Sequence, residues 1–133
     1  MEAALRPSSE VVRVLIADDE PLFAEMVDAI LRAEGIEVVG RARDGKEAID
    51  RTLALAPDVT LMDISMPVLD GIEATRQIRA TAPTACVIVL TGSTAVGEVD
   101  RARKAGAAAF LSKGRIASEL VATINDVAAR SDV

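Results

Sequence analysis

Short apolar runs alternate with segments of helical periodicity about five times along the chain. The apolar runs cover residues 11–17, 36–42, 59–63, 87–91 and 108–112. Several of them are apolar throughout, as in strands that are buried on both faces of a sheet. Such runs, separated by helices, are typical of a parallel sheet covered by helices on both sides. The pattern predicts one α/β domain over residues 11–129, with short tails at 1–10 and 130–133.

The helices are predicted from their first residues and from their apolar stripes. The first begins at Pro21, a residue that is tolerated at the first helical position, and Gly35 ends it. Its stripe, expected to face the sheet, comprises Leu22, Met26, Val27, Ile30 and Leu31. The fifth helix is predicted over 116–129 and has the stripe Leu120, Ile124 and Val127. Both stripes have the spacing of a helix with one buried face.

Two acidic pairs mark the starts of the second and third helices. Asp44 with Glu47, and Asp70 with Glu73, have the spacing at which two side chains cap the free N–H groups reciprocally.

The fourth helix, predicted over 94–105, has only Val96, Val99 and Ala102 on its inner side. It also contains Gly97, which costs about 1 kcal/mol relative to Ala. We expect it to be the least stable helix.

Composition narrows the possible functions. The net charge of −6 argues against direct binding of nucleic acid, which depends on Lys and Arg neutralising phosphates. No apolar run approaches the roughly 20 residues that span a bilayer, so no membrane association is expected. The single cysteine, Cys86, lies in an apolar run and is expected to be a small core residue, which fits a reducing cytoplasm.

Five polar residues lie at or just past the carboxyl ends of predicted strands: Asp18, Asp19, Asp63, Thr91 and Lys113. Parallel strands bring these ends to one edge, which is where open α/β sheets bind ligands. Three neighbouring carboxylates repel one another and need a cation, a basic group or protonation. Carboxylate oxygens suit Mg²⁺, and Lys113 adds a movable positive charge. A carboxylate in such a site can attack phosphorus to form an aspartyl phosphate, with Thr91 donating to a phosphoryl oxygen.

The motifs around these residues resemble the receiver domain of bacterial two-component response regulators. They are LIADDEP at 15–21, LMDISMPVLDG at 61–71, VLTG at 89–92 and AGAAAFLSK at 105–113. The match covers nearly all of 12–127 and looks closest to the branch whose members carry a C-terminal LuxR-type helix-turn-helix. The resemblance implies a flavodoxin-like αβα fold with strand order 2-1-3-4-5.

The resemblance also implies roles for individual residues. Asp63 would accept the phosphoryl group, and Mg²⁺ would be held by Asp19, Asp63 and the backbone carbonyl of Ser65. Asp18 would act mainly through a bound water, while Lys113 and Thr91 would hold the phosphoryl oxygens.

Two positions depart from the family pattern. Gly114 stands where many members have a cis proline, which implies a looser loop around Lys113. Phe110 replaces a frequent tyrosine, and with Thr91 it would form the switch that changes the surface of the fourth helix, fifth strand and fifth helix.

The implied protein is a cytoplasmic phosphoacceptor that assists its own phosphorylation and dephosphorylation, not an enzyme acting on other molecules. Its partner would be a sensor histidine kinase or a phosphotransfer protein. A homodimer formed on phosphorylation, and a C-terminal DNA-binding domain outside this chain, are left open.

Two other functions also remain open. A haloacid-dehalogenase-type phosphohydrolase uses similar groups but needs Asp-x-Asp after its first strand, where this chain has Asp18, Asp19 and Glu20. An unphosphorylated receiver-like docking domain would keep only the fold.

Overall fold

The sheet has five parallel strands in the order β2-β1-β3-β4-β5, as the sequence predicts. The structure, a computed structural model, describes residues 11–92 and 96–131. The strands are β1 (Arg13–Ala17), β2 (Glu37–Ala42), β3 (Val59–Asp63), β4 (Val87–Thr91) and β5 (Ala109–Ser112). The helices are α1 (Pro21–Ala33), α2 (Gly45–Leu55), α3 (Gly71–Thr81), α4 (Val96–Ala105) and α5 (Ile116–Ser131), with a short 3₁₀ turn, η2 (Lys113–Arg115), before α5. No helix in these described ranges is long and apolar enough to cross a membrane.

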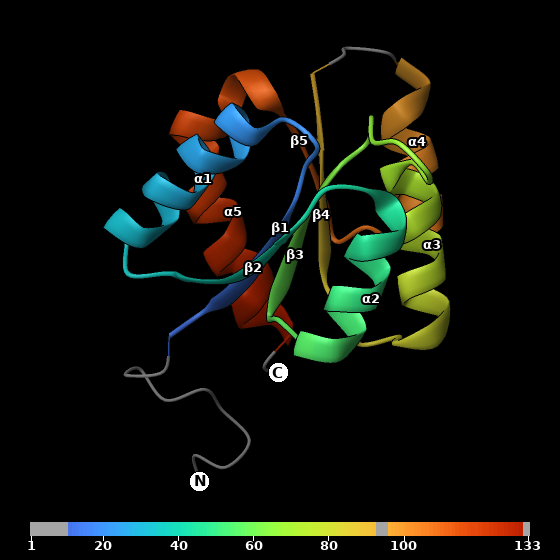
Figure 1. Cartoon of the computed structure of the whole chain (residues 1–133), viewed down its shortest axis with the longest axis horizontal. Helices are drawn as coiled ribbons and strands as arrows, with labels where there is room; N and C mark the ends of the chain where they lie inside the picture. Colours follow the sequence, from blue (N-terminus) through green and yellow to red (C-terminus); the bar gives the residue numbers. More distant parts are fainter. Residues whose placement is uncertain (1–10, 93–95, 132–133) are drawn as a thin grey trace, which may run out of the picture.

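Helices cover both faces of the sheet and divide the core into two parts. Helices α1 and α5 lie on one face, and α2, α3 and α4 lie on the other (Figure 1). Every residue of β3 and of β4 is buried, because these strands have a neighbour on each side and helices above and below. Their continuous apolar runs are what such strands require.

The register of the strands brings the predicted polar residues to one edge. Asp63 pairs with Leu90, and Thr91 pairs with Ser112. The next residue after β1 is Asp18, and its N–H donates to the carbonyl of Ala42 at 3.0 Å. The ends of β1, β3, β4 and β5 therefore lie side by side.

The predicted inner stripe of α1 is wrong at two positions. Leu22 is 81% exposed and Met26 is 45% exposed. The buried residues of α1 are Ala24, Val27 and Leu31. Each residue turns a helix by about 100°, so Leu22 and Met26 lie nearly opposite Ala24. The inner face of α1 is centred on Ala24, Val27 and Leu31, and the predicted stripe left Ala24 out.

The two predicted capping pairs form only in part. The N–H groups of Glu47 and Glu73 donate to Asp44 and Asp70 at 2.8 and 2.9 Å, as expected of N-caps. The return bonds differ from the prediction. The Glu47 side chain accepts from the N–H of Arg43, one residue before the cap, and Glu73 pairs with Arg76 instead.

The fifth helix has the predicted inner stripe, whereas the fourth has only part of its own. Leu120, Ile124 and Val127 of α5 are all buried, and the helix continues to Ser131. In α4, Ala102 is fully buried, whereas Val99 is 37% exposed, so the inner face is thin. The predicted first residue of this helix, Thr94, lies outside the described residues, and the low stability of α4 stays a prediction.

Candidate functional site

The ammonium group of Lys113 lies among three carboxylates at the carboxyl edge of the sheet. Its Nζ is 3.0 Å from Asp18 Oδ2, 2.9 Å from Glu20 Oε1 and 3.5 Å from Asp63 Oδ2. These residues come from the ends of β1, β3 and β5. The fold thus brings together predicted site residues that are far apart in the chain.

Several contacts hold Lys113 in place, although a glycine follows it. Its side chain is 16% exposed, and its Nζ lies 4.3 Å from the centre of the Phe23 ring on α1, a cation–π distance. The Ser112 hydroxyl accepts from the N–H of Gly114 at 3.2 Å and fixes the turn. Burial alone would lower the pKa of Lys113, but the bonds to Glu20 and Asp18 and the charge of Asp63 outweigh it, so the pKa is raised.

Asp63 is the last residue of β3 and is almost completely buried, at 3% exposure. Burial, followed by the negative charge of Asp18, raises the pKa of this carboxyl to about 6. Lys113 and the N–H of Ser65, 3.4 Å away, oppose the shift without cancelling it. At neutral pH the group is therefore mostly ionised, which leaves a carboxylate in a poorly solvated place.

An open cavity of about 430 Å³ lies next to this carboxylate. It is lined by Asp19, Glu20, Asp63, Ser65, Gly92 and Lys113. Oxygens of Asp18, Glu20 and Asp63 all lie within 4.8 Å of one another. The buried Oδ2 of Asp18 lies 3.0 Å from the Lys113 ammonium, which offsets only part of the negative charge of the three carboxylates. Crowded carboxylate oxygens beside an open space fit a hard divalent cation.

Asp18 and Asp19 differ sharply in environment. Asp18 is buried, and its Oδ1 accepts from the N–H of Glu20 at 2.8 Å. Asp19 is exposed and lines the cavity together with Asp63 and Ser65. The three predicted Mg²⁺ ligands therefore border one space, and their role as ligands stays a prediction.

Glu20 is the site residue that the sequence reasoning missed. It occupies the N-cap position of α1, but its side chain makes no cap hydrogen bond and reaches Lys113 instead. The available signal was its position directly after Asp18 and Asp19, at the end of a strand.

Thr91, predicted to donate to a phosphoryl group, has a different partner here. Its side chain is buried, and its hydroxyl donates to Glu98 Oε1 of α4 at 3.0 Å. The cavity beside Asp63 is lined by the next residue, Gly92, rather than by Thr91.

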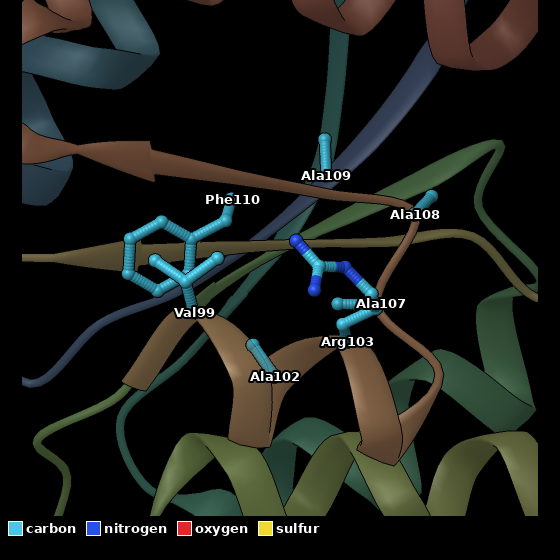
Figure 2. A pocket seen from close by; sticks show the side chains of 7 residues that line it. All are labelled: Val99, Ala102, Arg103, Ala107, Ala108, Ala109 and Phe110. Atoms are coloured by element: carbon cyan, nitrogen blue, oxygen red, sulfur yellow. The ribbon is translucent and has the colours of Figure 1, made fainter. Parts of the chain in front are cut away.

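Phe110, the other predicted switch residue, borders a groove between β5 and α4. This groove, about 240 Å³, is lined by Val99, Ala102, Arg103, Ala107, Ala108, Ala109 and Phe110. The Phe110 ring lies against Val99 (Figure 2). The part of Phe110 in switching stays a prediction.

The loop from β3 to α3 packs tightly behind Asp63. A Cβ atom at Gly71 would stand 2.1 Å from the carbonyl oxygen of Asp63, so only glycine fits there. The same loop holds Val68 at a φ of 69°, in the left-handed region that β-branched residues rarely adopt.

Comparison with known proteins agrees with this geometry. The family profile described as response regulator receiver domain matches residues 14–125. The chain is 44% identical over 112 residues to the transcriptional regulatory protein PdtaR of Mycobacterium tuberculosis, covering 84% of this chain and 54% of PdtaR. It is 38% identical over 115 residues to the chemotaxis protein CheY of Thermotoga maritima, covering 86% of this chain and 96% of CheY. The chain thus spans about half the length of PdtaR but nearly all of CheY.

Solved structures show the same fold. The signal receiver domain of the response regulator NarL from Mycobacterium tuberculosis superposes with a TM-score of 0.85 at 36% identity, covering 90% of this chain and 97% of that one. A LuxR-family two-component response regulator from Aurantimonas also superposes with a TM-score of 0.85, at 32% identity. The match covers 91% of this chain and 87% of that one.

Proposed function

This chain belongs to the response regulator receiver domain family, and from that premise we propose that Asp63 accepts a phosphoryl group in a Mg²⁺-dependent reaction. The observation that carries the proposal is the position of Asp63 Oδ2. It lies 3.5 Å from the Lys113 ammonium and beside the cavity that Asp19, Glu20 and Ser65 also line.

The chemistry follows from the groups around this oxygen. An Asp63 oxygen forms a bond to phosphorus as the bond between phosphorus and the donor's imidazole nitrogen breaks. The imidazole leaves with the electron pair and takes a proton from solvent. Because the pKa of Asp63 is about 6, the carboxylate is available at neutral pH without a separate base.

Lys113 balances charge during this step. Its ammonium already lies within ion-pair distance of Asp63, so it can follow the negative charge onto a phosphoryl oxygen. Asp19, Asp63 and the Ser65 carbonyl would hold Mg²⁺, which when bound supplies further positive charge to the phosphoryl oxygens. Asp18, which contacts Lys113 at 3.0 Å, would position the ammonium and a metal-bound water.

The phosphoryl donor is proposed to be a sensor histidine kinase or a phosphotransfer protein in the cytoplasm. Family membership argues against the haloacid-dehalogenase alternative. The relatives differ in function by name: they include a transcriptional regulatory protein and a protein-glutamate methylesterase. The output, a homodimer formed on phosphorylation and a DNA-binding domain outside this chain therefore stay predictions.

Intact-mass measurement after incubation with acetyl phosphate and Mg²⁺ tests the proposal. We expect the wild-type chain to gain the mass of one phosphoryl group and Asp63→Asn to gain none. Asp50→Asn, which changes an exposed aspartate on α2, is the matched control and should be phosphorylated normally. A wild-type chain that never gains this mass would favour the docking-domain alternative, and a modified Asp63→Asn would place the acceptor elsewhere.

A further inference from the structure

The hydrogen bond between Thr91 and Glu98 links the end of β4 to the first turn of α4. Thr91 Oγ1 donates to Glu98 Oε1 at 3.0 Å. Thr91 is 3% exposed, and Glu98 is partly buried. Bonds to a carboxylate in such a place are stronger than bonds between neutral groups. This contact therefore ties the Thr91 side chain directly to α4.

The Thr91 hydroxyl has one hydrogen, which limits what it can do. A hydroxyl group donates one conventional hydrogen bond at a time. Asp63 pairs with Leu90 on the neighbouring strand β4. Thr91, the next residue, therefore lies at the same edge of the sheet as a phosphoryl group on Asp63 would. Donation to a phosphoryl oxygen and donation to Glu98 are then alternatives.

We infer that Glu98 is a positioning residue that holds the Thr91 hydroxyl on α4 in the unphosphorylated protein and competes with the phosphoryl group for it. The inference rests on the proposed function. Phosphorylation releases Glu98 because Thr91 turns to the phosphoryl oxygens, and the released carboxylate is repelled by the added negative charge.

The structure of α4 explains why this one bond matters. Val99, the next residue, is 37% exposed, while Ala102 and Ala105 are the buried apolar residues on the described inner face. Small side chains give little packing, so among the described side chains of this helix the polar bond of Glu98 is a notable attachment to the sheet. Figure 2 shows Val99 and Ala102 beside Phe110, so movement of α4 would change the groove next to that ring.

A simpler reading is that Glu98 only stabilises α4, because an acidic residue in the first turn favours the helix dipole. Glu119 supplies the matched control. It lies in the first turn of α5 and pairs with Arg115 at 2.8 Å, not with Thr91. Removing Glu119 tests a general helix effect without touching Thr91.

The experiment measures the affinity of the full chain for beryllofluoride, a phosphoryl mimic, in the presence of Mg²⁺. Wild type, Glu98→Gln, Glu98→Ala and Glu119→Ala are compared, and Glu98→Ala is repeated in a Thr91→Ala background. We expect Glu98→Ala to bind about fivefold more tightly or better, in the usual range for coupled sites. The affinity of Glu98→Gln, which keeps an acceptor oxygen, should lie between those of wild type and Glu98→Ala. The affinity of Glu119→Ala should equal that of wild type.

The Thr91→Ala background decides the mechanism. If Glu98 acts through the Thr91 hydroxyl, the gain from Glu98→Ala should shrink markedly when that hydroxyl is absent. An equal gain in both backgrounds, an equal gain from Glu119→Ala, or no gain at all would overturn the inference. A wild-type chain that does not bind beryllofluoride would instead overturn the proposed function, and with it this inference.

Discussion

The ammonium group of Lys113 lies 2.9 Å from a carboxylate oxygen of Glu20, a residue 93 positions earlier in the chain. This contact is shorter than the one between Lys113 and Asp63, at 3.5 Å. The Lys113 ammonium is thus shared among three acids, and Glu20 is the nearest of them.

Replacing Glu20 should change the charge balance of the site. We expect Glu20→Gln to lower the pKa of Lys113, because the bond from Lys113 to Glu20 is a main cause of its elevation. Mg²⁺ binding should weaken, because the variant removes a negative charge whose oxygen lies within 4.8 Å of oxygens of Asp18 and Asp63. Isothermal titration and NMR of the lysine side chain measure the two effects. Glu25→Gln, an exposed residue of α1, is the control; equal effects from both variants would contradict the role of Glu20.

Stability without metal should depend on pH through Asp63. The folded-state pKa of about 6 lies above the ordinary value of 3.8, so between these values the folded state binds more protons than the unfolded state. The stabilisation is fully present below pH 3.8 and is lost as pH rises through 6. The total is about 3 kcal/mol, from roughly 1.4 kcal/mol for each pKa unit. Urea unfolding in EDTA should show this loss in wild type relative to Asp63→Asn, and a constant difference between them would refute it.

Magnesium should stabilise the unphosphorylated fold, because it relieves repulsion among Asp18, Asp19 and Asp63. At a hundredfold excess over its dissociation constant, binding adds about 2.7 kcal/mol to the free energy of unfolding. Asp63→Ala should melt at a higher temperature than wild type in EDTA and gain less from Mg²⁺. Calorimetry with and without Mg²⁺ measures both, and equal melting of wild type in the two buffers would contradict a shared metal site.

The ring of Phe23 should matter to phosphorylation although it bears no reactive group. Phe23→Leu keeps an apolar side chain but removes the π face that lies 4.3 Å from Lys113. A loss of about 1 kcal/mol of cation–π attraction should slow phosphorylation by acetyl phosphate about fivefold. Met26→Leu, on the exposed face of the same helix, is the control. Unchanged rates for Phe23→Leu would show that the carboxylates alone hold Lys113.

Replacing Val68 with a residue that tolerates its backbone conformation should stabilise the fold. It is 77% exposed and has a φ of 69°, so it contributes little packing in a conformation that costs a β-branched residue about 1 kcal/mol or more. Asn tolerates this conformation, and Val68→Asn should raise the free energy of unfolding by about 1 kcal/mol. Val11→Asn, at an exposed position before β1, controls for polarity. A destabilised Val68→Asn would indicate that the valine side chain makes needed contacts.

The strands and the main site residues could be predicted because each leaves a local signal. The runs that form β3 and β4 are mostly apolar and end at Asp63 and Thr91, and their predicted bounds are confirmed. Because parallel strands end at one edge of the sheet, the sequence predicts that Asp18, Asp63 and Lys113 lie together, as they do.

The partners of Glu20 and Glu98 leave no such signal. Whether Glu20 caps α1 or reaches Lys113 depends on where β5 ends, far along the chain. Whether Glu98 meets Thr91 depends on how α4 lies against β4, since periodicity alone shows neither the rotation nor the tilt of a helix with so few buried residues.

The tight packing behind Asp63 gives the site a direction. With the carbonyl of Asp63 only 2.1 Å from where a Cβ at Gly71 would stand, the backbone of Asp63 has no room to move toward α3, whatever is attached to its side chain. Gly92, by contrast, lines the open cavity, and a Cβ placed there would meet no described atom within 4 Å. A group attached to the Asp63 side chain would therefore extend into the cavity rather than toward α3.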